Sequence, residues 1–155
     1  MGCETQVDVL CTKDGPLANF LVQEAETFHH CQPLTPATDV PFSYHAYPLI
    51  ITVPERFCLE LARMGLVFVT LALTKEQLNT AYALEQLGVS ITLGWQGSKK
   101  SDAIQQCLAD LMVDQKRRQQ HSRSAMQVVD GKALERLASF VPAEKAPTQE
   151  PLPEM

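Results

Sequence analysis

The sequence has few of the features that would assign it to a class of protein. Thirteen basic residues stand against eighteen acidic ones, giving a formal charge of −5, so the composition disfavours a nucleic-acid partner. The longest basic cluster, Lys116-Arg117-Arg118, adjoins polar residues of an expected helix and is interpreted as a solvated face. No apolar run reaches the ~18 residues that a membrane helix needs, and the N-terminus does not resemble a signal peptide. We therefore expect a cytoplasmic protein without a membrane span.

Cysteine pairs at metal-binding or disulfide spacing are also missing. The five cysteines are scattered and form no Cys-x-x-Cys motif, so neither a zinc site nor a disulfide framework is indicated. His29 and His30 adjoin Cys31, but adjacent strand residues point to opposite faces and rarely converge on one ion. Cys58 lies among apolar neighbours and is interpreted as a core thiol rather than a nucleophile. We expect no metal and no cofactor.

Short apolar runs alternate with helical patterns along the 155 residues. Strands are expected over residues 7–11, 28–34, 49–53, 66–73 and 89–93. Helices are expected over residues 17–27, 55–64 with Pro54 at the first helical position, 74–88 with Thr74 as the N-cap, an interval opening at Ser101, and 132–140. Glycines 65 and 88 are expected to end two of these helices, and residues 94–97 to form a turn.

Strands that alternate with helices at this spacing predict βαβ units and a parallel sheet. The length fits one α/β domain, which we place at residues 1–141. Residues 142–155 are rich in proline and glutamate with little to bury, so a disordered tail is expected there.

A series of small motifs between Leu49 and Leu137 carries a family resemblance. A strand at 49–53 precedes the helix motif Leu59-Glu60-Leu61-Ala62-Arg63-Met64-Gly65, and Glu76-Gln77 is followed by Ala81, Leu84 and Gly88. The segment Val129-Asp130-Gly131-Lys132 leads to Glu135-Arg136. In order and spacing these motifs resemble the C-terminal domain of the UDP-sugar hydrolases of pseudaminic acid biosynthesis, which are similar to B-type glycosyltransferases. The resemblance implies a Rossmann-like three-layer sandwich with a mainly parallel sheet, half of a B-type glycosyltransferase fold.

The resemblance also implies a set of ligand-binding residues for UDP or a UDP-sugar. Glu60 matches the glutamate that accepts hydrogen bonds from ribose hydroxyls, and an exposed helix glutamate is the structural alternative. Gln77 matches a sugar-contacting position, with a capping role in the first helical turn as the alternative. Tyr44 lies in a proline-rich loop near the expected carboxyl ends of the strands, where open α/β sheets bind ligands. Arg56 is placed to reach a phosphate.

The phosphate loop departs from the family. A Gly-Gly-x-Thr-like loop is replaced by Pro54-Glu55-Arg56-Phe57. Glycines let backbone N–H groups approach a phosphate, whereas proline lacks the donor. A like charge at ~4 Å costs about 4 kcal/mol at an effective dielectric of about 20, so Glu55 opposes a diphosphate there.

Three functions stay open at this point. The first is a non-catalytic or degenerate nucleotide-sugar-binding domain related to the enzymes of surface-glycan biosynthesis. The second is a protein-interaction or regulatory domain that has lost its ligand and contacts a protein supplying the missing domain. The third, an independent UDP-sugar hydrolase, is disfavoured because the family's catalytic base lies on an N-terminal domain that these residues do not include, and no catalytic residue is assigned.

Overall fold

The computed structural model describes residues 5–11, 13–34, 43–97 and 101–140. The chain divides into two compact units, Met1–Ala46 and Tyr47–Met155, and each is described by itself. A single domain over residues 1–141 stays a prediction. The expected disordered tail at 142–155 lies outside the described residues.

The first unit is a small parallel βαβ arrangement. Strand β1 (Val7–Leu10) pairs in parallel with β2 (Cys31–Leu34), and α1 (Pro16–Gln23) connects them. Helix α1 buries Ala18 and Leu21 and ends four residues before the predicted Thr27. Its end is early because the N–H of Thr27 and the N–H of Phe28 both turn back to the carbonyl of Glu24. A 3₁₀ turn, η1 (Tyr44–Ala46), closes the unit.

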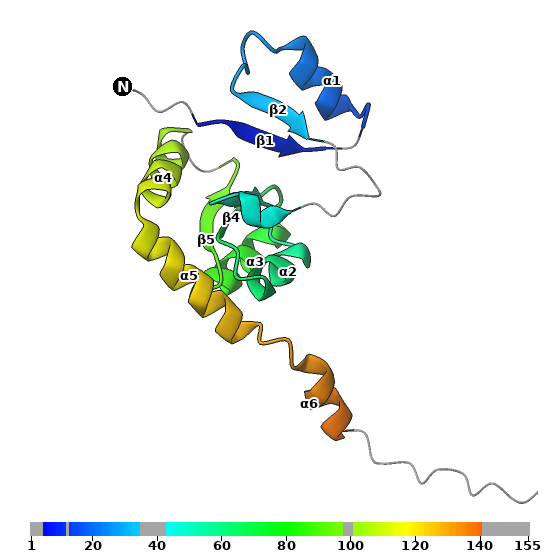
Figure 1. Cartoon of the computed structure of the whole chain (residues 1–155), viewed down its shortest axis with the longest axis vertical. Coiled ribbons are helices and arrows are strands. Elements are labelled where there is room, and N and C mark those ends of the chain that lie inside the picture. The colour runs from blue at the N-terminus through cyan, green and yellow to red at the C-terminus, as the bar shows by residue number, and fades with distance from the viewer. Residues whose placement is uncertain (1–4, 12, 35–42, 98–100, 141–155) are drawn as a thin grey trace, which may run out of the picture. The chain divides into compact units, whose positions relative to one another are not determined.

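The second unit contains the larger sheet and most of the helices (Figure 1). Its elements in chain order are β3 (Ile50–Thr52), α2 (Phe57–Arg63), β4 (Phe68–Ala72), α3 (Lys75–Gln86), β5 (Ile91–Trp95), α4 (Ser101–Val113), α5 (Gln115–Val128) and α6 (Ala133–Phe140). The strands lie in the order β3-β4-β5, and both pairings are parallel. The predicted α/β class with parallel sheets is therefore confirmed.

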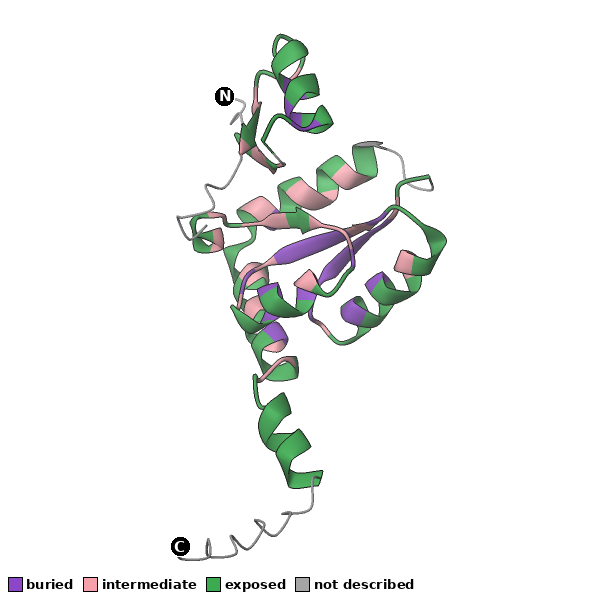
Figure 2. Cartoon of the chain, turned by 90° about the vertical axis from the view of Figure 1, so that its right-hand side faces the viewer, coloured by how far each residue is buried: buried purple, intermediate pink, exposed green. Residues whose placement is uncertain are grey.

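Helices cover both faces of the β3-β4-β5 sheet, and the buried residues concentrate in its strands (Figure 2). On one face, Val69 of β4 and Ile91 and Leu93 of β5 form a core cluster with Leu111 of α4. Ile104, Cys107 and Leu108 of α4 are partly buried and pack against this cluster. Helix α3 packs against β4 and β5, and α2 packs against α5.

The ends of α2 and α3 follow the prediction. Gly65 and Gly88 have φ angles of 70° and 68°, a region that favours glycine. Two backbone hydrogen bonds close each helix. At the end of α2 the N–H of Gly65 donates to the carbonyl of Ala62, and the N–H of Leu66 donates to that of Leu61. At the end of α3 the N–H groups of Gly88 and Val89 donate in the same way to the carbonyls of Glu85 and Leu84. This is a Schellman motif, which satisfies carbonyls that a helix end otherwise leaves without partners.

Two further boundaries, both in the second unit, differ from the prediction. Helix α2 begins at Phe57, so Pro54 is buried in the preceding turn instead of standing at the first helical position. The turn arises because the N–H of Glu55 donates to the carbonyl of Val53. Strand β5 runs on to Trp95, where a turn was expected, because a register shift beside Thr70 and the φ of 82° at Gly94 let its pairing with β4 continue.

Helix α6 differs from the other helices in burying none of its residues. None of the helices in the described part of the chain is long and apolar enough to cross a membrane.

Candidate functional site

In the second unit, a ligand site is expected first at the carboxyl ends of β3, β4 and β5. Parallel strands end at one edge of their sheet, and open α/β sheets bind ligands beside that edge. Three loop segments meet there: residues 53–56 after β3, residues 73–74 after β4, and residues 96–97 after β5. The hydrogen bonds within and between these loops determine which polar groups remain available to a ligand.

The loop after β3 uses its own backbone donors. The N–H of Glu55 donates to the carbonyl of Val53 at 2.9 Å, and the N–H of Cys58 donates to the carbonyl of Glu55 at 2.9 Å. Pro54 has no N–H to offer. These donors therefore point at the chain itself and not at a phosphate.

Cys58 is fully buried at the start of α2, with its Sγ 3.3 Å from the carbonyl oxygen of Val53. Burial raises the pKa of the Cys58 thiol above its ordinary value. A raised pKa and a buried position describe a packed, protonated thiol, which agrees with the interpretation as a core residue. Within the described residues, no group of three or more His, Cys, Asp or Glu side chains is arranged to hold a metal ion.

The side chain of Gln77, predicted to contact a sugar, forms hydrogen bonds with the loop after β3 and with the loop after β4. Its Oε1 accepts from the N–H of Leu73 at 2.9 Å, and its Nε2 donates to Oε1 of Glu55 at 3.0 Å. The backbone N–H of Gln77 donates to the hydroxyl of Thr74, the N-cap of α3, at 3.3 Å. Both ends of the amide are engaged within the chain, and the sugar contact of Gln77 stays a prediction.

Trp95 and Lys75 also lie at this edge of the sheet, and neither was singled out from the sequence. The indole N–H of Trp95 donates to the carbonyl of Leu73 at 3.4 Å, and the Lys75 ammonium lies 5.9 Å from the centroid of the indole ring. Such a cation–π contact contributes about 0.5–1 kcal/mol at an exposed site. The signal was hidden because Trp95 was assigned to a turn instead of to the end of a strand.

A hollow of about 460 Å³ lies beside α2, and it contains two of the predicted ligand residues. Its lining consists of Arg56, Leu59, Glu60, Arg63, Met64 and Val129. Arg56, Glu60 and Arg63 stand three or four positions apart, the spacing that puts side chains on one helix face. Arg63 was not singled out from the sequence, although this spacing from Glu60 was available to find it.

The three predicted residues of the second unit divide between two places. Arg56 and Glu60 share the α2 hollow, whereas the amide of Gln77 is bound to Glu55 and Leu73. Tyr44 is half-buried in η1 of the first unit. Its role beside the other three residues stays a prediction.

Comparison with solved structures gives a likeness, whereas the comparisons of sequence give none. No protein-family model matches the chain, and no curated protein does. Among solved structures, the spinosyn rhamnosyltransferase SpnG in complex with thymidine diphosphate matches with a TM-score of 0.49 and 17% sequence identity. The match covers 88% of this chain and 46% of SpnG, so the chain spans less than half the length of that enzyme. At this identity the likeness concerns the fold, and the function is argued from the residues of this chain.

Proposed function

We propose that the second unit is a non-catalytic, cytoplasmic domain that binds a uridine nucleotide or UDP-sugar in the α2 hollow. The supporting observation is that Arg56, Glu60 and Arg63 line one hollow of ligand size together with apolar side chains. Guanidinium groups form paired hydrogen bonds with phosphate oxygens, and a carboxylate accepts hydrogen bonds from ribose hydroxyls. Leu59 and Met64 offer apolar contact to a base, as small-molecule sites commonly do.

The proposed phosphate contact comes from side chains instead of from the backbone donors of the loop after β3. In the resembling family that contact belongs to backbone donors, but here the donors of Glu55 and Cys58 bond within the chain. Arg56 and Arg63 would take over the role as side chains. Because long exposed side chains lose rotamer freedom when they bind, we expect weak affinity, and this is what we mean by a degenerate site.

Saturation-transfer NMR with UDP and UDP-N-acetylhexosamine tests the proposal on the full chain. We expect transfer from uridine protons at millimolar ligand, lost in Arg56→Ala and in Glu60→Gln. The matched controls are Arg123→Ala and Glu135→Gln, which change the same residue types at exposed positions outside the hollow. Absence of transfer in the unmodified chain would refute nucleotide binding, and turnover of the UDP-sugar abolished by Glu60→Ala would refute the non-catalytic assignment.

A second candidate is a protein-interaction or regulatory domain, and the exposed apolar residues of the same region favour it. Leu59 is 46% exposed, Met64 37% and Leu73 46%. Methionine and arginine are enriched in protein interfaces, and the two leucines add apolar surface. Under this candidate, light scattering shows a mass that rises with concentration or with an added partner, and Leu59→Glu removes the rise. A strict monomer that still binds UDP favours the first candidate.

A further inference from the structure

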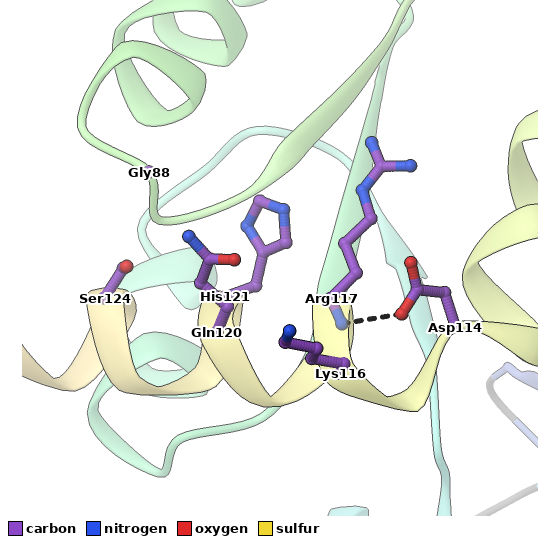
Figure 3. A pocket seen from close by; sticks show the side chains of 7 residues that line it. All are labelled: Gly88, Asp114, Lys116, Arg117, Gln120, His121 and Ser124. Atoms are coloured by element: carbon purple, nitrogen blue, oxygen red, sulfur yellow. Dashed lines mark hydrogen bonds between the residues drawn. The ribbon is translucent and has the colours of Figure 1, made fainter.

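A second hollow of about 460 Å³ lies between the turn at Gly88 and one face of α5 (Figure 3). Its lining consists of Gly88, Asp114, Lys116, Arg117, Gln120, His121 and Ser124. None of these residues lines the α2 hollow or was assigned a function from the sequence. The Lys116-Arg117 pair was interpreted as part of a solvated face.

The α5 residues of this hollow share one face of the helix. Lys116, Gln120 and Ser124 are spaced by four positions, and so are Arg117 and His121, which puts all five on neighbouring rows of the helix surface. Figure 3 shows the His121 ring and the side chains of Gln120 and Ser124 on the side of α5 that faces the Gly88 turn. The hollow is therefore lined by polar and basic groups from one rigid element.

The net charge of the lining is positive. Within the described part of the chain, neither the Lys116 ammonium nor the Arg117 guanidinium forms an ion pair. Asp114 is the one carboxylate in the lining, and its Oδ1 already accepts the backbone N–H of Arg117 at 2.9 Å as the N-cap of α5. Two cations thus face one carboxylate that is engaged with the backbone.

The remaining lining groups are donors suited to an anion. Gln120 provides an amide N–H₂ and Ser124 a hydroxyl. At Gly88 an added Cβ would lie 3.6 Å from the Cβ of Ser124, so the backbone of the turn comes close to α5. Small residues on both sides keep the hollow open to a compact ligand.

The geometry points to this hollow, which we call the α5 hollow, as a binding site for a phosphate group, free or carried as a monoester on a small metabolite. Lys116 and Arg117 supply the charge, while Gln120 and Ser124 supply neutral donors and His121 a ring nitrogen. Charge-assisted bonds from Lys and Arg to phosphate oxygens are about twice as strong as neutral ones. The assignment does not depend on nucleotide binding at the α2 hollow, because the two linings share no residue.

His121 provides an internal reporter of anion binding. Burial lowers the pKa of His121, and the Arg117 guanidinium lowers it further, while the Gly88 carbonyl and the Glu85 carboxylate of α3 act in the opposite direction. These effects together favour the neutral imidazole when no anion is bound. A bound phosphate dianion favours the imidazolium, so its binding should raise the pKa of His121.

Titration of the full chain with inorganic phosphate and, separately, with a sugar phosphate monoester tests the site by ¹H–¹⁵N and histidine-ring NMR. We expect saturable shifts at Gly88, Gln120, His121 and Ser124, with a higher pKa for His121 at saturation. The double variant Lys116→Gln with Arg117→Gln should lose both effects. The matched control, Lys13→Gln with Arg123→Gln, removes the same charge at exposed positions elsewhere and should keep them.

Saturation by inorganic phosphate identifies the free ion as sufficient, and saturation by the monoester alone identifies an organic phosphate as the ligand. Either result supports the site. Shifts that grow linearly with both salts and persist in the Lys116/Arg117 variant would overturn it, because they report ionic strength only. Loss of UDP binding with retained phosphate binding would remove the proposed function and leave this inference standing.

Discussion

At the scale of single residues, the backbone conformation at Gly88 favours glycine at that position. Its φ is 68°, and an added Cβ would meet only the Cβ of Ser124 at 3.6 Å and its hydroxyl at 3.9 Å, which are ordinary contacts. Any penalty for a side chain here therefore comes from backbone conformation and not from crowding. In this left-handed region of backbone conformation, residues other than Gly, Asn and Asp are disfavoured by about 1–2 kcal/mol.

We predict that Gly88→Ala lowers the free energy of unfolding by about 1–2 kcal/mol, measured by urea denaturation. Gly88→Asn should cost less, because asparagine tolerates the left-handed region. Equal losses in the two variants would contradict the conformational explanation and indicate that the side chain itself is not accommodated.

Two threonines at paired positions of β4 and β5 should respond oppositely to one substitution. Thr70 is fully buried, and its hydroxyl has no hydrogen-bond partner among the residues that the structure describes. Thr92, its register partner, is also buried, but its hydroxyl accepts the N–H of Gly94 at 3.0 Å. A buried polar group without a partner costs about 1–3 kcal/mol, and a satisfied one contributes to stability.

Thr70→Val should therefore raise the free energy of unfolding by about 1 kcal/mol, since it replaces an unsatisfied hydroxyl with a methyl group. Thr92→Val should lower it, because the N–H of Gly94 loses its acceptor. Thermal and urea unfolding of both variants measure the difference. Destabilisation by Thr70→Val would mean that its hydroxyl has a partner in solution.

The candidate site was predictable only where its geometry depends on local sequence. Arg56 and Glu60 share a hollow because residues four apart lie on the same side of a helix, and this spacing is visible in the sequence. The side chain of Gln77, by contrast, donates to Glu55, which is 22 residues away. Such a contact depends on how two loops meet at the sheet edge, which no local pattern describes.

At the scale of helices and strands, the two helix ends marked by glycine were predicted better than the start of α2. Gly65 and Gly88 end their helices as expected because a positive φ is required there and few other residues supply it. The start of α2 was placed too early because proline is favoured at a first helical position. The tight turn in which Glu55 bonds back to Val53 overrides that preference.

Helix α6 depends on a small set of charges at its start. Oδ1 of Asp130 accepts the N–H of Lys132 at 3.0 Å, and the Asp130 carboxylate takes two bonds from the Arg136 guanidinium, at 2.8 and 3.0 Å. The Arg136 bonds, followed by the Lys132 N–H, hold the pKa of the Asp130 carboxyl well below its usual range. A carboxyl with a lowered pKa stabilises the folded form above its unfolded pKa and loses that effect as pH falls through the folded value.

We predict that Arg136→Ala raises the pKa of Asp130 toward its ordinary value, as measured by carboxyl NMR titration. In the unmodified chain the amide signals of α6 should persist through mild acid and change only when Asp130 becomes protonated. Arg123→Ala is the control, because it removes the same charge from an exposed position on α5. An unchanged Asp130 titration in Arg136→Ala would show that the bidentate pair does not persist in solution.

At the scale of the whole chain, the apolar core is divided unequally. All the buried apolar side chains of the described residues belong to residues 47–155, except Ala18 and Leu21 of α1. The first unit combines a two-stranded sheet with one helix of eight residues. A lone pair of strands is marginally stable in water, and chains near 40 residues rarely fold without a disulfide, a metal or a partner.

We therefore predict that a fragment of residues 47–155 keeps helical and strand circular dichroism and unfolds cooperatively. A fragment of residues 1–46 should show no cooperative transition by itself. The comparison also tests the predicted single domain over residues 1–141, because one continuous domain requires each part to contribute to the stability of the other. If the larger fragment unfolds at a clearly lower urea concentration than the full chain, the first unit stabilises the β3-β4-β5 sheet. If both unfold at the same concentration, residues 47–155 are a folding unit, and the α2 and α5 hollows should both remain testable in that fragment.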